Sequence, residues 1–423
     1  MAARKPQARA LVSRALLTLT GGVSQQPAYH RNHTKCEVQE NAVSSLVTGL
    51  HKRNGSRLVK NIAAGNPYDS VFLHAINRDS TEKYIFGVYH TTAPASGQFV
   101  VDIGGTAHTL TLTGSASAYL TSTSTPGADL VAVTILDYTI IVNKTVTVAL
   151  EATTSTGTFK GTKQKFADLT GISPAPTTGD VWEIAGDLAN PTDTYYVKWD
   201  GSVWRETLKP GITYKLDAAT MPHQMVRNPD GSFTISPIVW NNRVVGDKST
   251  LPDPSLIGRK INSAFFFRNR LGFTADEKIV MSRSGDFFNL FPSSVINPKD
   301  SDPIDVSVNH PGKVCVIRHA IPFNKVLLLT ATNAQFVLSA QDALTQSSVS
   351  ITLATEVPAS ILCPPVGMGS NVYIPTDYGG YSQIREYYVY PNGVRYDTNV
   401  ITEEVPSYIP KGLIKIDTTA AGD

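Results

Sequence analysis

The chain has little cysteine, and the cysteines it has are odd in number and far apart. Cys36, Cys315 and Cys363 are the three in 423 residues. A disulfide scaffold needs a dense and even set, so this usage argues against one and fits a protein made in a reducing cytosol. No window reaches the roughly 18 consecutive apolar residues that suggest a membrane-spanning helix.

The sequence also lacks the motifs of the common enzyme classes. It contains no P-loop, no dinucleotide fingerprint, no HExxH, no CxxC pair and no GxSxG elbow. Residues 300–305, DSDPID, resemble a calcium loop without its glycine and terminal glutamate, and we interpret them as a turn capped by carboxylates. Glu403, Glu404 and Asp397 fit a solvated loop better than a glycosidase pair. We therefore predict no catalytic residue, no metal site and no cofactor.

Charge is sparse and unevenly placed. Charged residues make up 17% of the chain, and the formal net charge of +2 hides a polarity. Residues 1–60 hold ten Lys or Arg against Glu37 and Glu40, which gives +8; the remaining 27 basic and 33 acidic residues give −6. Such a basic arm either docks on an acidic surface, nucleic acid or protein partner, or is a solvated tail.

The chain does have short apolar runs that alternate with turn residues. Residues 261–292 show it best: the apolar run 264–267 is followed by a turn at 268–270 and by further runs at 271–273 and 278–282. Runs of 130–135 and 138–143 form a second hairpin pattern through Asp137. Such alternation predicts antiparallel hairpins, which bury their faces only by packing on one another.

A separate β group follows a segment rich in Thr, Ser, Gly, Lys and Pro at 145–179. It comprises 181–184, 195–199 and 203–206, with Asp200-Gly201 as a tight-turn signal, and holds three of the four tryptophans. These tryptophans suit the core of a small module better than a ligand box.

We therefore expect a mainly β chain: propeller-like antiparallel β blades, an inserted small β module and a basic N-terminal arm. A β-sandwich is the alternative architecture. The expected units are an arm and docking segment at 1–60, first blade units at 61–144, the inserted module at 145–225, and further blade-like units at 226–423, incomplete at the C-terminal end.

The turn Arg268-Asn269-Arg270 lies between two apolar runs and allows two interpretations. Its guanidinium groups could hold a phosphate or a carboxylate of a neighbouring chain. Alternatively, they form an intramolecular lock against Asp276, Glu277 or Asp286.

A family resemblance rests on motifs that occur in a fixed order. GGVSQQP (21–27), FFFRNRLGF (265–273), SRSGDFFNLFP (282–292) and VPSYIP (405–410) are the most specific of them. With INRD, VNK, YYVKWDG, MPH, DPIDV, IPF and FVLSA between them, the chain resembles the tail tubular protein B, or nozzle protein, family of T7-like short-tailed bacteriophages almost end to end.

The resemblance implies a structural protein of the virion tail, assembled in the host cytoplasm. Family members form a homo-hexameric tube below the portal adaptor ring, help to seat the tail fibres, and line the channel through which double-stranded DNA leaves without sequence-specific binding. They meet the host envelope only at infection. The fold implied is mostly β with a propeller-like domain, and no cofactor is implied.

Two features depart from the family pattern. Residues 143–180 are shorter than the family's insertion, and the chain ends soon after VPSYIP, where relatives continue. Residues 413–416 suggest the first strand of a further unit, so we expect either a second nozzle chain that supplies the C-terminal half or a truncation.

The candidate assembly residues are polar groups of the arm, of its GGVSQQP motif and of the turn at 268–270. An acidic body suits a channel that does not grip DNA, so the basic arm is expected to face the adaptor or a neighbouring subunit. The rival functions are a virion-associated glycan hydrolase of the β-propeller or tailspike-like kind and a monomeric carbohydrate-binding β protein. The candidates are Arg4, Lys5, Arg9, Arg14, Gln25, Gln26, Arg31, Lys52, Arg53, Arg268, Asn269 and Arg270.

Overall fold

The structure is a computed structural model that describes residues 18–61, 68–91, 97–186, 194–389 and 396–418. Its elements are strands joined by short turns, with two short α-helices and one 3-10 helix among the described residues. The prediction of a mainly β chain is confirmed. Among these residues no helix is long and apolar enough to cross a membrane.

Four sheets are four-stranded antiparallel meanders, as the hairpin rhythm predicted. Each runs in chain order, and most of the consecutive strands are joined by short turns, whereas a longer connection joins β18 to β19. They are β3 (Ser70–Asn77), β4 (Lys83–His90), β5 (Gly97–Asp102), β6 (Ala107–His108); β16 (Ser263–Phe267), β17 (Arg270–Ala275), β18 (Lys278–Met281), β19 (Ile304–Ser307); β20 (Ile317–Phe323), β21 (Val326–Ala331), β22 (Gln335–Ser339), β23 (Ser350–Thr355); and β24 (Val366–Met368), β25 (Asn371–Tyr378), β26 (Tyr381–Val389), β27 (Tyr396–Val400).

A fifth sheet joins segments that are far apart in the sequence, in the order β7-β15-β14-β9-β8. Two helices, α1 (Ala116–Thr121) and α2 (Pro126–Asp129), lie between its first and second strands along the chain. Because β14 crosses the expected boundary at residue 225, this sheet draws on three of the four expected units, whose limits stay predictions. Its strands are β7 (Leu110–Leu112), β8 (Leu130–Ile135), β9 (Tyr138–Asn143), β14 (His223–Arg227) and β15 (Phe233–Pro237).

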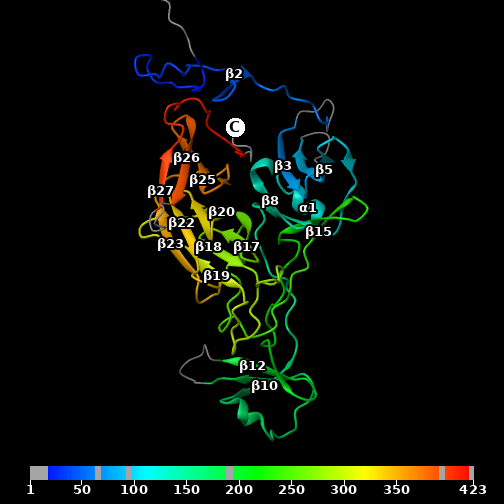
Figure 1. The fold of residues 1–423 in the computed structure, drawn as a ribbon. Coiled ribbons are helices and arrows are strands. Elements are labelled where there is room, and N and C mark those ends of the chain that lie inside the picture. Colours follow the sequence, from blue (N-terminus) through cyan, green and yellow to red (C-terminus); the bar gives the residue numbers. More distant parts are fainter. Residues whose placement is uncertain (1–17, 62–67, 92–96, 187–193, 390–395, 419–423) are drawn as a thin grey trace, which may run out of the picture.

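The remaining two sheets lie at opposite ends of the molecule (Figure 1). At one end is the hairpin of β1 (Ala42–Ser45) and β2 (Gly49–Lys52). At the other is a small module whose first two strands are parallel and whose others are antiparallel. It contains β10 (Thr158–Lys163), the 3-10 helix η1 (Phe166–Leu169), β11 (Asp180–Ile184), β12 (Tyr195–Trp199) and β13 (Trp204–Thr207).

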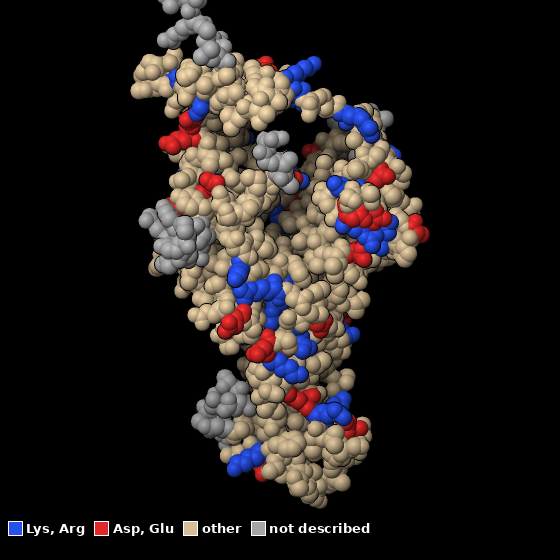
Figure 2. All heavy atoms as spheres, in the orientation of Figure 1, with Lys and Arg blue, Asp and Glu red and all other residues tan. Residues whose placement is uncertain are grey.

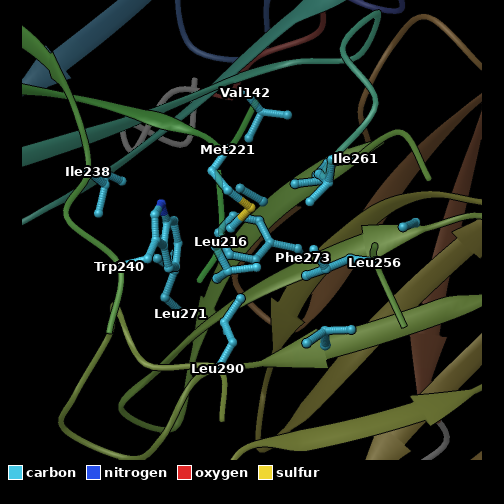
Figure 3. Packing of buried hydrophobic residues seen from close by; sticks show 14 of the residues in the cluster. Val142, Leu216, Met221, Ile238, Trp240, Leu256, Ile261, Leu271, Phe273 and Leu290 are labelled. Atoms are coloured by element: carbon cyan, nitrogen blue, oxygen red, sulfur yellow. The ribbon is translucent and has the colours of Figure 1, made fainter. Parts of the chain in front are cut away.

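The buried cores lie between successive sheets. One apolar cluster joins the five-stranded sheet to β16–β19, the next joins β16–β19 to β20–β23, and a third joins β20–β23 to β24–β27. In the first, Val142 of β9 and Leu271 and Phe273 of β17 pack around Trp240 and Met221 (Figure 3). Each sheet thus hides its apolar faces only against its neighbours.

Contacts between strands of neighbouring sheets follow the order β3, β8, β16, β20, β24, a blade-like succession. Among the described elements β24 and β3 share no extensive contact, so closure into a propeller ring stays a prediction. The prediction of a strand at 413–416 is wrong, because this segment is irregular. The Ile416 backbone lies against the Cys363 thiol.

Candidate docking surface

The GGVSQQP motif is bound to the other end of the described chain. The Gln25 amide donates to the Glu404 carbonyl at 2.8 Å, and Gln25 Oε1 accepts 2.9 Å hydrogen bonds from the backbone and hydroxyl of Ser407. Lys35 forms an ion pair with Glu404. The carboxylate considered for a glycosidase pair is thus part of an internal contact, and two motifs of the resemblance, GGVSQQP and VPSYIP, lie together.

From this contact the chain runs across the end of the molecule to the first sheet (Figure 1). We call residues 18–61 the strap. Its far end lies on the turn between β5 and β6, where a Cβ added to Gly105 would be 2.4 Å from the Val59 carbonyl oxygen. Gly105 has a φ of +91°, which also favours glycine. The strap therefore contacts the chain at both ends.

Between these ends the strap exposes a series of large apolar side chains. Leu46 and Val47 are each 90% exposed, at the tip of the β1–β2 hairpin, and Leu58 and Tyr29 are each 81% exposed. Apolar side chains gathered on an exposed segment mark an interaction site, because water solvates them poorly. Val38, Val43, Leu50 and Val59 add to this surface.

The strap is also basic. It holds six Lys or Arg residues and two Glu residues, a net charge of +4. Lys52 is exposed and makes no hydrogen bond or ion pair within the described residues, whereas Arg53 Nε donates to Asn41 Oδ1 at 3.1 Å. Arg31 bonds the Gln26 carbonyl and Glu37. Both charge and apolar surface are therefore available to a partner.

Five further candidates of the basic arm make no side-chain hydrogen bond that the structure describes. Arg4, Lys5, Arg9 and Arg14 lie outside the described residues. The Gln26 side chain makes no hydrogen bond within the described residues, although the Gln26 backbone N–H donates to Ser24 Oγ at 3.3 Å. The two adjacent glutamines therefore differ, because the Gln25 side chain holds the strap and the Gln26 side chain does not.

Arg270 is not available to a neighbouring chain. Its side chain is 1% exposed and donates five hydrogen bonds of 2.7 to 3.2 Å. Burial lowers its pKa, against the favourable charge of Asp302. The docking interpretation is corrected for this residue, because the lock is internal. Its acceptors are the carbonyls of Ser282, Asp300, Ser301, Asp302 and Leu344 and not the expected carboxylates.

Arg268 and Asn269 form the two-residue turn between β16 and β17. Their φ angles of 46° and 59° are those of a turn with two left-handed residues. Arg268 donates to the carbonyls of Asp342, Lys325 and Ala340, so it too is held within the chain. Asn269 is exposed, and its carbonyl accepts from the Gly285 amide at 3.0 Å.

The small module carries an aromatic groove of about 400 Å³ that sequence reasoning did not single out. Trp199 and Trp204 pair across β12 and β13 with ring centroids 5.1 Å apart, and Phe166 at its edge is 48% exposed. These tryptophans are half-buried, so they both pack the module and line its surface. The adjacent placement of two tryptophans around Asp200-Gly201 was the available signal.

The carboxylates of the segment that resembles a calcium loop accept hydrogen bonds from backbone N–H groups. Asp302 accepts from the Ser293 and Lys299 amides, and Asp305 accepts from the Ser255 amide at 2.7 Å. Within the described ranges no group of three His, Cys, Asp or Glu side chains could hold a metal ion.

A comparison with protein families defines the class. The profile of the bacteriophage nozzle protein family matches residues 9–164 and 152–423. The chain therefore belongs to this family.

A particular relative is the tail tubular protein gp12 of Escherichia phage T7. It is 29% identical over an alignment of 512 residues that covers 96% of this chain and 63% of the relative. The chain thus spans less than two thirds of the length of that curated protein.

Solved structures are more distant. A Bacteroides fragilis protein described as a candidate 6-phosphogluconolactonase superimposes with a TM-score of 0.29 at 10% identity, covering 78% of this chain and 80% of that chain. The NanB sialidase of Streptococcus pneumoniae also gives a TM-score of 0.29 at 10% identity, covering 82% and 65%. Likeness at this level defines neither a fold nor a function.

Proposed function

We propose that this chain is a structural subunit of the tail nozzle of a short-tailed phage, located in the virion tail and assembled in the host cytoplasm. The family match over nearly the whole chain carries this proposal. In it, copies of the chain form a homo-hexamer attached below the portal adaptor ring. The proposal assigns the chain no catalytic activity and no cofactor.

The strap is the surface proposed to meet the adaptor ring or a neighbouring subunit. Its exposed apolar side chains supply area to bury, and its net charge of +4 supplies attraction to an acidic partner. It is also anchored at both ends on its own chain, so its shape is set before the partner arrives. Docking a preformed surface costs less ordering entropy than docking a free arm.

The remaining parts of the chain fit the other roles of a nozzle. Residues 61–423 carry a net charge of −6, which limits attraction between the channel wall and the double-stranded DNA that passes through it. The small module, at the end opposite the strap, offers its aromatic groove to tail fibres. In this proposal the host envelope is met only at infection.

The test is a change confined to the strap's exposed surface. Replacing Leu46 and Val47 with Ser removes about 1.5–3 kcal/mol of burial per side chain, so docking weakens by at least about tenfold. Because both side chains are 90% exposed, the isolated chain keeps its stability. Phage carrying this variant should contain fewer particles with a nozzle, counted in electron micrographs.

The matched control replaces Val239 and Val314 with Ser. These two residues lie outside the strap and are 87% and 75% exposed. That variant should assemble normally. If the strap variant also assembles normally, the strap is not the docking surface, whereas absence of the wild-type chain from purified tails contradicts the nozzle proposal itself.

A further inference from the structure

A cluster of basic side chains lies where the five-stranded sheet meets β20. Lys144 follows β9, and Arg318 and His319 are consecutive residues of β20. The charges of Lys144 and Arg318 both reach His319, and Arg318 also acts on Lys144. Three groups that carry or can accept a positive charge therefore share one place in the fold.

His319 is buried, Lys144 and Arg318 are half-buried, and two of their nitrogen atoms lack partners. His319 is 6% exposed, and its Nε2 has no hydrogen-bond partner among the described residues, while the backbone of Ser360 and Ile361 hydrogen-bonds its ring. Arg318 Nε is buried and equally unpartnered. Within the described part of the chain, Arg318 makes no hydrogen bond or ion pair at all.

One negative charge lies nearby, and it acts on Lys144. It belongs to Asp129, whose Oδ2 also accepts hydrogen bonds from the hydroxyls of Thr123 and Thr125. Lys144 Nζ itself donates to the Ala128 carbonyl at 3.1 Å, which leaves donors free and neutralises no charge. An internal carboxylate therefore does not balance Arg318.

Burying these three basic groups together costs free energy. Burial first, and the charge of Lys144 second, lower the pKa of His319 to about 3. Burial lowers the pKa of Lys144 as well. Like charges held together away from water cost free energy, and a buried donor without an acceptor adds to that cost. A bound anion removes both costs at once.

We propose that Lys144, Arg318 and His319 form a binding site for a small oxyanion of the phosphate or sulfate class. An arginine fork and an ammonium group are the side chains that recognise such anions. Figure 2 shows Lys or Arg atoms on one face of the molecule, between the β3–β6 side and the β24–β27 side. The buried Nε and Nε2 atoms admit a small ion more readily than a polymer backbone.

The experiment is a thermal-unfolding titration of the full chain at neutral pH with inorganic phosphate, against sodium chloride of equal ionic strength. An anion that binds the folded state raises the melting temperature with its concentration. Phosphate should stabilise the wild-type chain beyond chloride. Arg318→Gln should weaken this response about tenfold or more, because hydrogen bonds to a charged group are lost.

The same variant separates a binding role from a structural one. Without phosphate, Arg318→Gln should be as stable as wild type or more stable, because it relieves repulsion with Lys144. Destabilisation both with and without phosphate would assign Arg318 a packing role and overturn the site. Arg57→Gln, at an exposed position of the strap, controls for the loss of one charge and should keep the phosphate response.

Two further outcomes also count against the proposal. An equal response to phosphate and chloride would show general screening. Tighter Arg318-dependent binding of a short oligothymidylate than of phosphate would make the cluster a nucleic-acid contact. The inference does not depend on the nozzle assignment, since the isolated chain is sufficient to test it.

Discussion

At the residue scale, Arg270 determines how the segment between β18 and β19 is held. Its guanidinium binds carbonyls at residues 300–302, at the end of the long connection that follows β18, and Leu344 in the connection between β22 and β23. One side chain thus ties the β16–β19 sheet to the next sheet. The two terminal nitrogens of the arginine carry four N–H groups in a rigid planar fork and make these contacts, whereas lysine has one nitrogen with three N–H groups.

We predict that Arg270→Met lowers the free energy of unfolding by at least about 3 kcal/mol. Three of the bonds are buried, and each carbonyl left unsatisfied costs about 1 kcal/mol or more. Urea unfolding followed by fluorescence measures the loss. Arg205→Met, at a side chain that is 72% exposed, is the control and should change little. Equal stability of the two variants would show that Arg270 is dispensable.

Sequence reasoning left open whether this turn docks a neighbouring chain or forms an internal lock, and it named the wrong acceptors for the lock. A charged residue in a turn is normally exposed, and the five acceptors are backbone carbonyls that no sequence pattern marks. The same limit applies to Gln25. Gln25 was a candidate for assembly contacts, yet its side-chain oxygen accepts a hydrogen bond from Ser407, which lies 382 residues away. Burial and long-range pairing, and not residue type, decided both outcomes.

At the element scale, two sheets use the same device in their second strand. Gly272 of β17 lies opposite Phe265, and Gly87 of β4 lies opposite Phe99. A Cβ added at either glycine would be 2.2 Å from the ring of its partner. The aromatic ring therefore covers the glycine backbone, which fills the gap left by the missing side chain and fixes the strand register.

We predict that Gly272→Ala destabilises the chain by about 1–3 kcal/mol, because Phe265, which is 2% exposed, must leave its position. Thermal unfolding gives the size of the effect. The control is Gly367→Ala in β24, an exposed strand glycine where an added Cβ meets nothing within 4 Å. A loss confined to Gly272 supports the close approach, and identical melting curves for both variants would refute it.

The strands themselves were predictable where apolar residues alternate and turns are short. β8 and β9 have the bounds that the pattern gave, Leu130–Ile135 and Tyr138–Asn143. β10 was missed because Thr158–Lys163 holds Phe159 as its one large apolar residue and pairs in parallel with β11. The pairing of β7 with β15 was also missed, since strands distant in sequence leave no local signal.

At the scale of the whole molecule, the two ends of the described chain are joined by contacts. The strap begins on residues 404–407 beside the last sheet and ends on Gly105 in the first sheet. The C-terminal segment returns toward the first sheet as well, since the Lys415 charge reaches His74 of β3. The two ends of the described chain therefore link the first sheet to the last, which hairpin pairing does not do.

Three sheets also contain a buried or half-buried histidine that stays neutral, which makes the stability of the whole chain depend on pH. Burial and the Lys415 charge lower the pKa of His74 to about 4, and that of His319 is lowered to about 3. His223 is fully buried between Tyr119 and the Met221 carbonyl, and burial lowers its pKa too.

Because these folded-state pKa values lie below the unfolded value of 6.5, the unfolded chain binds more protons at mildly acidic pH. Stability is therefore complete above about pH 6.5 and falls as pH decreases toward the folded pKa values. Each unit of pH in that window costs about 1.4 kcal/mol per histidine, so at about pH 5 His74 and His319 together remove about 4 kcal/mol. Urea unfolding across this range should show the loss, and His319→Gln should reduce its slope. His33→Gln, at an exposed position, should leave the slope unchanged and is the control. If His319→Gln also leaves the slope unchanged, His319 does not titrate with unfolding.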